Sequence, residues 1–239
     1  MSENTLVKTI QSQPLLSLNI RNVNQLFHGF AVGDFAVIYG STSVQSLTSF
    51  LCVRAQLPVQ LGGLGSNIIF VDGGNTFRLY QVARLARLHH LDPRQTLERI
   101  YISRAFTVYQ MATLILERLK KIIKQYNAKL TIISDIAGFF LDKDVAEEES
   151  RRVYSQLTAY LQNFAKENQL IIIATYPPHR ETRRNNFLQA LTCGRANIVI
   201  SLKRTTYERE FILEKHPHYM SGVAKFPFEN LTLNDFIGA

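Results

Sequence analysis

A turn that opens at Gly40 has the place of a phosphate-binding loop, because an apolar run precedes it and an apolar-rich helix is expected after it. Such a loop reads G-x-x-x-x-G-K-[ST]. Its glycines let backbone N–H groups converge on phosphate, and its lysine neutralises the charge. Counting from Gly40 puts Gln45 at the second glycine, Ser46 at the lysine and Leu47 at the hydroxyl that holds magnesium. These side chains offer neither the backbone freedom of glycine, nor a cation, nor a magnesium ligand. The pattern leaves two alternatives, a broken nucleotide site or a turn that was never one.

Basic side chains gather in the interval 177–204, which holds six Lys or Arg residues and one acidic residue. The interval therefore contributes +5 to a formal net charge of +8. Such a local excess favours a polyanionic partner, and Arg, Asn and Tyr side chains suit phosphate contacts and stacking on unpaired bases. The alternative is a solvated basic loop that binds nothing. The basic residues are Arg180, Arg183, Arg184, Arg195, Lys203 and Arg204.

The turn at Gly40 and the interval 177–204 must be positioned by apolar runs that do not alternate with polar residues. Such runs are typical of strands buried on both faces, and the amphipathic segments between them predict helical crossovers. After Thr175 we expect a loop rich in Pro, Arg and Asn, and then two strands with no helix between them, which are therefore expected to be antiparallel. The predicted fold class is α/β, a doubly wound, mostly parallel central sheet flanked by helices, with antiparallel strands at the C-terminal end. The expected strands are 35–39, 67–72, 100–103, 130–135, 170–175, 197–204 and 209–216, and the expected helices include 45–56 and 108–126.

The composition excludes several other classes of protein. With 239 residues and 46% hydrophobic residues, the chain is expected to form one domain over residues 1–239, with residues 1–20 as an N-terminal extension. No apolar run approaches the roughly 20 residues of a membrane span. Cys52 and Cys193 make no disulfide framework, and the N-terminus lacks the features of a signal peptide. We expect an intracellular protein, cytoplasmic in a prokaryote and nuclear in a eukaryote, without a cofactor or a metal site.

Three short elements between residues 70 and 106 resemble the ATP-binding core of the RecA/RadA recombinase family, in the branch that includes archaeal RadA. That core has a strand ending in Asp-x-Glu-Gly-Thr-Phe-Arg, then an L-D-P helix start and an A-R-A-F element. The resemblance extends more weakly over residues 24–228, and it implies a RecA-like fold without the helical N-terminal domain that many members carry. The matching residues are Asp72, Thr76, Phe77 and Arg78, then Leu91, Asp92 and Pro93, then Arg104, Ala105 and Phe106.

The resemblance also implies that catalytic residues have been lost. The family's catalytic glutamate, which polarises the attacking water, falls on Gly74. Its Thr-Asn-Gln element, whose glutamine senses the γ-phosphate and relays to a DNA-binding loop, is replaced by residues 175–177, Thr-Tyr-Pro. Asp135 remains at the Walker B position. With the resemblance, the turn at Gly40 is interpreted as a degenerate nucleotide site, and we expect no ATP hydrolysis.

In RecA-like proteins a DNA-binding loop follows the fifth strand, which corresponds here to the interval 176–197. The leading hypothesis is an ATPase-deficient recombinase paralog that binds DNA, expected to be single-stranded, without ATP. It would assist recombination or repair as a homo-oligomer beside an active recombinase. One alternative is a structural adaptor that acts through protein contacts. Another is an atypical ATPase with a basic residue from elsewhere near Gly40 and a substitute for Gly74. The expected DNA contacts are Arg180, Arg183, Arg184, Arg195, Lys203 and Tyr176.

Overall fold

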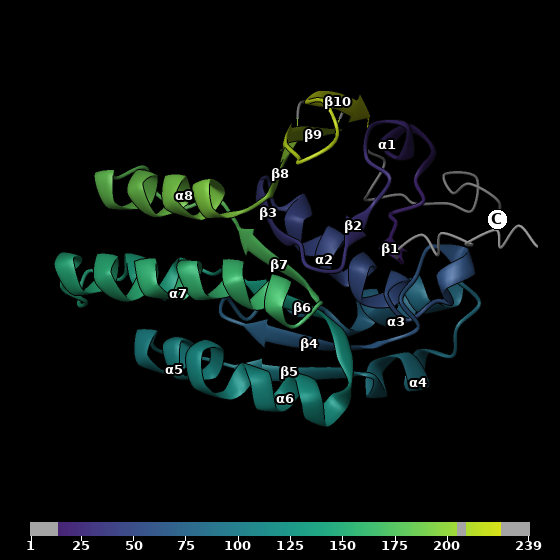
Figure 1. Cartoon of the computed structure of the whole chain (residues 1–239), viewed down its shortest axis with the longest axis horizontal. Coiled ribbons are helices and arrows are strands. Elements are labelled where there is room, and N and C mark those ends of the chain that lie inside the picture. Colours follow the sequence, from purple (N-terminus) through teal and green to yellow (C-terminus); the bar gives the residue numbers. More distant parts are fainter. Residues whose placement is uncertain (1–13, 205–208, 226–239) are drawn as a thin grey trace, which may run out of the picture.

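A central sheet of eight strands organises the computed structural model, which describes residues 14–204 and 209–225 (Figure 1). The strand order is β10-β9-β8-β3-β7-β6-β4-β5. The strands from β8 to β5 in this order are parallel to one another, and β9 and β10 complete the sheet in antiparallel pairing. The bounds are β3 (Phe35–Gly40), β4 (Asn67–Asp72), β5 (Ile100–Arg104), β6 (Ala128–Ser134), β7 (Ile171–Tyr176), β8 (Ile198–Arg204), β9 (Arg209–Lys215) and β10 (Gly222–Lys225).

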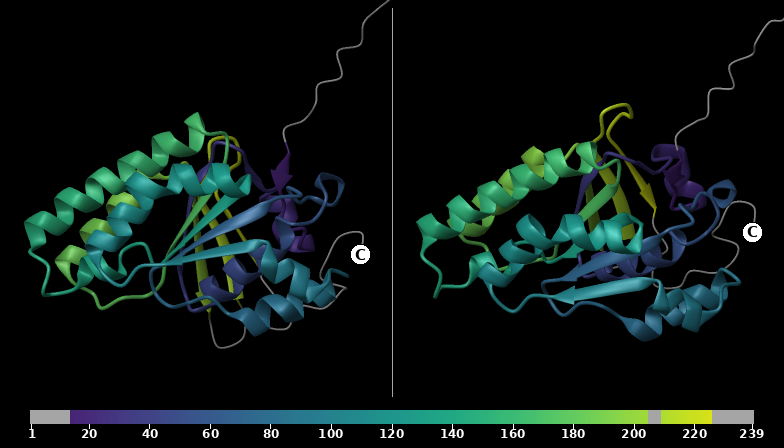
Figure 2. Two further views of the ribbon diagram at one scale, coloured as in Figure 1. Left: turned by 90° about the horizontal axis from the view of Figure 1, so that it is seen from below. Right: turned by 60° about the horizontal axis from the view of Figure 1, so that its bottom comes forward.

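Helices cover both faces of this sheet, as the apolar strands predict. One group packs with α1 and a two-stranded ribbon over one hydrophobic cluster, and the other group covers a second cluster (Figures 1 and 2). Neighbouring strand residues such as Val37 and Ile38 are both fully buried but belong to different clusters, because successive side chains point to opposite faces. The first group is β1 (Leu15–Leu16), α1 (Arg21–Leu26), β2 (Phe30–Ala31), α2 (Ser43–Arg54), α3 (Leu79–Leu88) and α4 (Pro93–Glu98), and the second is α5 (Val108–Thr113), α6 (Leu119–Tyr126), α7 (Glu147–Glu167) and α8 (Arg183–Arg195).

The helix expected over residues 108–126 forms, but a π-helical turn, η2 (Leu114–Arg118), divides it into α5 and α6. Its buried positions Met111, Ile115, Leu119 and Ile123 recur every four residues. In an α-helix with about 3.6 residues per turn this spacing would rotate away from the sheet. The wider π turn offsets that drift and keeps the row on one face.

The structure contradicts the prediction of a loop between residues 176 and 197. The helix α8 occupies 13 of these residues, and the Thr182 side chain caps its first turn by accepting a hydrogen bond from the Asn185 N–H at 3.1 Å. The apolar positions of α8 are too few to reveal its period, because Leu188 is the only large apolar residue that is fully buried among its 13 residues. This crossover also makes β8 parallel to β3, so the antiparallel strands begin only at β9.

Part of the expected N-terminal extension lies within the core. Leu16, Leu18 and Ile20 are at most 1% exposed and join the first hydrophobic cluster. Residues 1–13 and the end of the weak resemblance, residues 226–228, lie outside the described part of the chain. Within residues 14–204 and 209–225, none of the helices has the length and apolar character needed to cross a bilayer.

Candidate nucleic-acid interface and the phosphate-loop position

The turn after β3 is too short to form a phosphate cradle. β3 ends at Gly40, and only Ser41 and Thr42 separate it from Ser43, the first residue of α2. Gly40 has φ +109°, and a side chain there would meet the carbonyl oxygen of Leu202 on the adjacent strand β8. Glycine is therefore required here by backbone conformation and by the approach of β8, without a phosphate.

The first backbone N–H groups of α2 have partners within the turn itself. The Ser43 N–H donates to Ser41 Oγ at 3.3 Å, the Val44 N–H to the Ser41 carbonyl at 3.1 Å, and the Gln45 N–H to the Thr42 carbonyl at 3.2 Å. In a phosphate-binding loop such groups point together at the anion. Here they are already satisfied by the chain.

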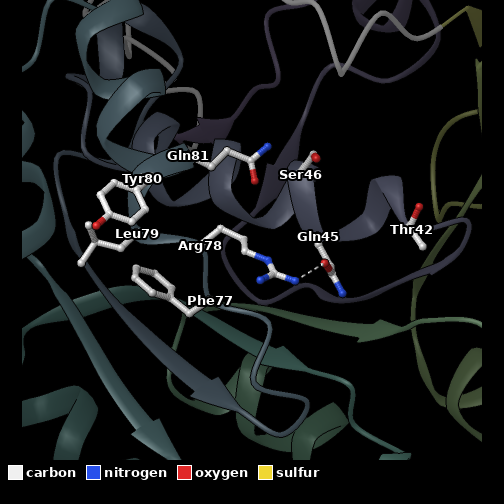
Figure 3. Close-up of a pocket in the computed structure, with 8 residues that line it drawn as sticks. All are labelled: Thr42, Gln45, Ser46, Phe77, Arg78, Leu79, Tyr80 and Gln81. Carbon is white, nitrogen blue, oxygen red and sulfur yellow. Dashed lines mark hydrogen bonds between the residues drawn. The ribbon is translucent and has the colours of Figure 1, made fainter.

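The three residues at the motif's diagnostic positions all lie inside α2. Leu47 is fully buried in the first hydrophobic cluster, which explains why this position carries leucine. Gln45 and Ser46 are half-buried and line a hollow of about 530 Å³ beside Arg78 and Tyr80 (Figure 3). The Arg78 guanidinium donates to Gln45 Oε1 at 3.4 Å, so a cation does lie close to the turn after β3.

Asp72, at the end of β4, holds the turn that leads to α3. Its buried carboxylate accepts hydrogen bonds from the Thr76 N–H at 2.8 Å, the Phe77 N–H at 3.4 Å and the Ser134 hydroxyl at 2.9 Å. Arg104 Nε lies 3.6 Å from the same carboxylate. The motif residue Asp72 is therefore a structural anchor of this turn.

Gly74 makes room for the side chain of Asp135. A Cβ atom at position 74 would lie 2.9 Å from the Asp135 Cβ and 3.0 Å from the Thr76 Cγ2, closer than ordinary contacts. A glutamate at this position would therefore displace Asp135 or Thr76. Glycine at position 74 and the placement of Asp135 belong to one packing arrangement.

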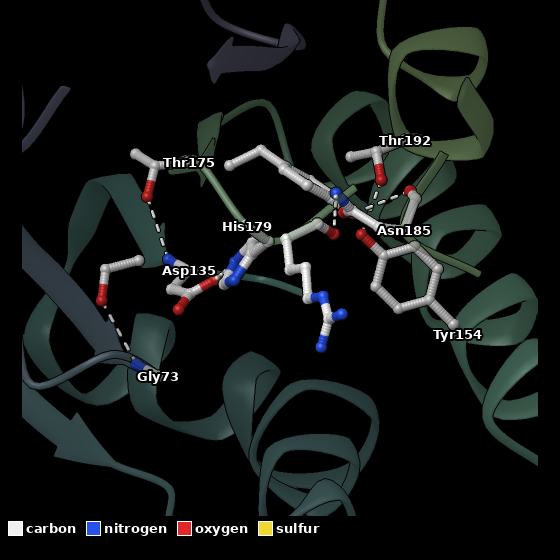
Figure 4. Close-up of polar contacts among 10 residues, drawn as sticks. Gly73, Asp135, Tyr154, Thr175, His179, Asn185 and Thr192 are labelled. Carbon is white, nitrogen blue, oxygen red and sulfur yellow. Dashed lines mark hydrogen bonds and ion pairs between the residues drawn. The ribbon is translucent and has the colours of Figure 1, made fainter. Parts of the chain in front are cut away.

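Asp135 is engaged by its own chain on two sides (Figure 4). Its backbone has φ +47°, and its N–H donates to the Thr175 hydroxyl at 3.0 Å. Its carboxylate makes a hydrogen bond with the His179 ring, with 2.8 Å between Oδ1 and Nε2. This pair fixes the segment after β7 to the end of β6. Residues 135 and 179 are 44 apart in the sequence, so spacing gave no signal for it.

Tyr176 does not face the surface. Its side chain is 2% exposed, and its hydroxyl donates to Asn185 Oδ1 at 2.6 Å. Burial raises the pKa of the Tyr176 hydroxyl well above its usual range. The prediction that Tyr176 stacks on bases is therefore wrong: the residue ends a buried strand, and its side chain belongs to the second hydrophobic cluster.

Arg184 is also turned inward. Its Nη1 donates to the carbonyl oxygens of Asp142 and Val145, both at 3.0 Å, and the residue is half-buried. Nearby, the Asn185 side chain donates to the Arg180 carbonyl at 3.2 Å. The predicted DNA contact at Arg184 is corrected to a structural tether between α8 and the 142–145 segment.

The other predicted contacts do not form one cluster. Arg180 and Arg183 are exposed where the segment after β7 enters α8. Arg195 is half-buried at the other end of α8, about 18 Å away along the helix axis. Lys203 is exposed near the end of β8, beyond the register pair of Gly40 and Leu202. Arg180 and Arg183 therefore form the core of the candidate interface.

Comparison with known proteins places this architecture. The family model described as Rad51 matches residues 16–180, more than half of the chain. The chain belongs to the Rad51 family. The DNA repair and recombination protein RadA of Cenarchaeum symbiosum (strain A) is 36% identical over 90 residues, which is 38% of this chain and 22% of that protein. This Rad51-family chain is thus matched along only about a fifth of that relative.

The Rad51 match and the candidate interface overlap only at one end. The matched region includes the turn after β3, Asp72, Asp135 and His179. It ends at Arg180, so α8, β8 and Lys203 lie beyond it. The tether residues of α8 are therefore supplied by a part of this Rad51-family chain that the family pattern does not cover.

Proposed function

We propose that this protein is an ATPase-deficient recombinase paralog that binds single-stranded DNA without ATP and assists homologous recombination or repair. The observation that carries the proposal is the turn between Gly40 and α2, whose N–H groups are satisfied within the chain. A triphosphate would have to break these bonds and would find no lysine at position 46. Membership of the Rad51 family supports the recombination context.

Independence from ATP is supported by the way in which the segment 177–183 is held. The resemblance assigns the family's γ-phosphate relay to the position of Pro177, which has no donor or acceptor on its side chain. Instead, His179 pairs with Asp135, and Asn185 and Arg184 hold the segment's far end. The chain's own contacts thereby fix the segment and leave Arg180 and Arg183 at the surface.

The test is a fluorescence-anisotropy titration of labelled single-stranded and duplex DNA at several salt concentrations, with and without Mg-ATP. The native protein is compared with an Arg180→Ala/Arg183→Ala variant. The matched control is Lys120→Ala/Lys121→Ala, which removes two exposed charges from α6. We expect salt-dependent binding that ignores ATP. In the Arg180/Arg183 variant the salt slope should fall by about 1.4, or 0.7 for each of two phosphate contacts.

Two results would overturn the proposal. Binding that appears only with Mg-ATP would contradict ATP independence and favour an atypical ATPase, for which the proximity of Arg78 to Gln45 is the supporting observation. Absence of binding to either DNA at low salt would favour the structural adaptor.

The contact between His179 and Asp135 has its own experiment. His179→Ala removes the hydrogen bond with Asp135, so the segment 177–183 loses one attachment and DNA affinity should fall about threefold to tenfold. Asp135→Asn retains a hydrogen-bond acceptor for His179 and should lose less. Equal DNA affinity of the native protein and His179→Ala would show that the contact between His179 and Asp135 does not position the interface.

Family membership also supports proposals about assembly. We propose that the protein forms a homo-oligomer, acts beside an active recombinase and works within the cell, in the cytoplasm of a prokaryote or the nucleus of a eukaryote. Light scattering after size-exclusion chromatography tests the oligomer, because a monomeric mass at micromolar concentration would contradict it.

A further inference from the structure

The outward side of α3 carries one tyrosine and two arginines in helical register. Tyr80 is 89% exposed, and Arg84 and Arg87 are exposed four and seven residues later. At this spacing the three side chains lie on one side of the helix, within about 10 Å along its axis. Arg78 precedes them and is also exposed.

The α3 segment carries no negative charge of its own. Residues 73–91 contain no Asp or Glu. Two exposed arginines on other helices do pair with a carboxylate one turn away, Arg94 with Glu98 and Arg151 with Glu147. In the described part of the chain, neither Arg84 nor Arg87 makes an ion pair or a side-chain hydrogen bond. Their charge is therefore available to an anionic partner.

Tyr80 has no structural reason to be so exposed. It adds nothing to either hydrophobic cluster, and Leu79 beside it is 49% exposed. Both residues border the hollow of about 530 Å³ between α3 and α2, where Figure 3 shows the Tyr80 ring beside Leu79 and the Arg78 side chain extending toward Gln45. An exposed ring between arginines is the combination that binds unpaired bases and their phosphates.

We infer that α3 is a second contact surface for single-stranded DNA, with a base stacked on Tyr80 and phosphates bound by Arg84 and Arg87. The inference rests on the proposed function, because it adds a second site on the same ligand. α3 and α8 belong to the helix groups on opposite faces of the sheet (Figure 1), so this surface is separate from Arg180 and Arg183. A single strand that contacts both surfaces crosses the edge of the sheet, and a shorter strand occupies one surface.

The experiment measures anisotropy of a labelled oligo(dT) of about 40 nucleotides at several salt concentrations. Tyr80→Ala should weaken binding about tenfold, because base stacking is lost, whereas Tyr80→Phe should bind as the native protein does. Arg84→Ala/Arg87→Ala should lower the salt slope by about 1.4. The control Lys120→Ala/Lys121→Ala should leave both quantities unchanged. All of these side chains are exposed, and circular dichroism serves to check that each variant is folded.

Three outcomes separate this inference from the proposed function. If the α3 variants bind as the native protein does while Arg180→Ala/Arg183→Ala loses affinity, the inference is wrong and the proposed function stands. If the native protein binds no DNA at low salt, both fail. If Arg84→Ala/Arg87→Ala leaves DNA binding intact but abolishes self-association, the partner of α3 is an acidic surface on a second copy, and the inference is overturned.

Discussion

Two segments that follow parallel strands at the same edge of the sheet differ in what they leave available to a ligand. After β3, Ser41 and Thr42 alone lead into α2, and the first N–H groups of that helix bind within the turn. After β7, six residues, 177–182, lead into α8 and are held by side chains, and Arg180 and Arg183 remain exposed.

The difference shows that the backbone conformation of a turn, as well as its residue types, decides which of its groups are available to an anion. The helix α2 extends into the place where the loop would be, and the position of the magnesium ligand becomes part of the core as Leu47. The segment after β7 keeps its freedom to contact a ligand because its anchors are side chains, which leave other side chains exposed. Four predictions test this contrast, from the largest expected effect to the smallest.

Leu47→Ala should lower the free energy of unfolding by about 2–5 kcal/mol, because it leaves a cavity in a fully buried site. Its neighbour Ser46 is half-buried, and Ser46→Ala should change stability by less than about 0.5 kcal/mol. Urea unfolding measures both. A cost below about 0.5 kcal/mol for Leu47→Ala would show that α2 is not packed into the core at this position.

His89, which follows α3, should make the stability of the protein sensitive to acid. Burial, with Arg54 and His90 as neighbouring positive charges, lowers the pKa of His89 to about 4. The unfolded chain, with a pKa near 6.5, takes up this proton first. Neutral His89 therefore contributes roughly 2–3 kcal/mol to the free energy of unfolding. This contribution is complete above about pH 6.5 and is lost as pH falls toward 4.

The measurement is urea unfolding between pH 7.5 and 4.5 for the native protein and His89→Gln. Carboxylates also titrate in this range, so the difference between the two proteins isolates the histidine. Parallel stability curves for the two proteins would contradict the prediction.

Gly74→Glu, which introduces the glutamate that the resemblance places at this position, should destabilise the protein by about 1–3 kcal/mol, because the new Cβ crowds Asp135 and Thr76. The matched control is Gly194→Ala in α8, which has open space around the new Cβ and should stabilise by about 0.5–1 kcal/mol. Thermal unfolding compares them. If Gly74→Glu were as stable as the native protein, Asp135 would not depend on the glycine for its place.

Ser46→Lys should have the smallest effect, with no measurable binding of Mg-ATP by isothermal titration calorimetry. The lysine would project from the first turns of a helix that has no cradle of free N–H groups. Ser46→Arg serves as a control for added charge alone. Micromolar binding of Mg-ATP by Ser46→Lys, absent from Ser46→Arg, would contradict the prediction. It would show that the turn lacks only a lysine and that its backbone can still accept a triphosphate.

The sequence by itself determined most of the architecture. Non-alternating apolar runs such as 35–39 and 170–175 require burial on both faces, and that requirement leads to parallel strands with helices on each side. The spacing of buried residues over 108–126 likewise determined a helix, and three short elements determined the family.

The tertiary structure decided which residues are available to a ligand. Composition could not show that Tyr176 ends inside the core, that Arg184 turns toward the carbonyls of Asp142 and Val145, or that α8 separates Arg195 from Arg183. Nor could it pair Asp135 with His179, 44 residues away. Local patterns report which face of an element is buried, because burial follows the period of the element. The contacts of a polar side chain depend on elements brought together only by folding.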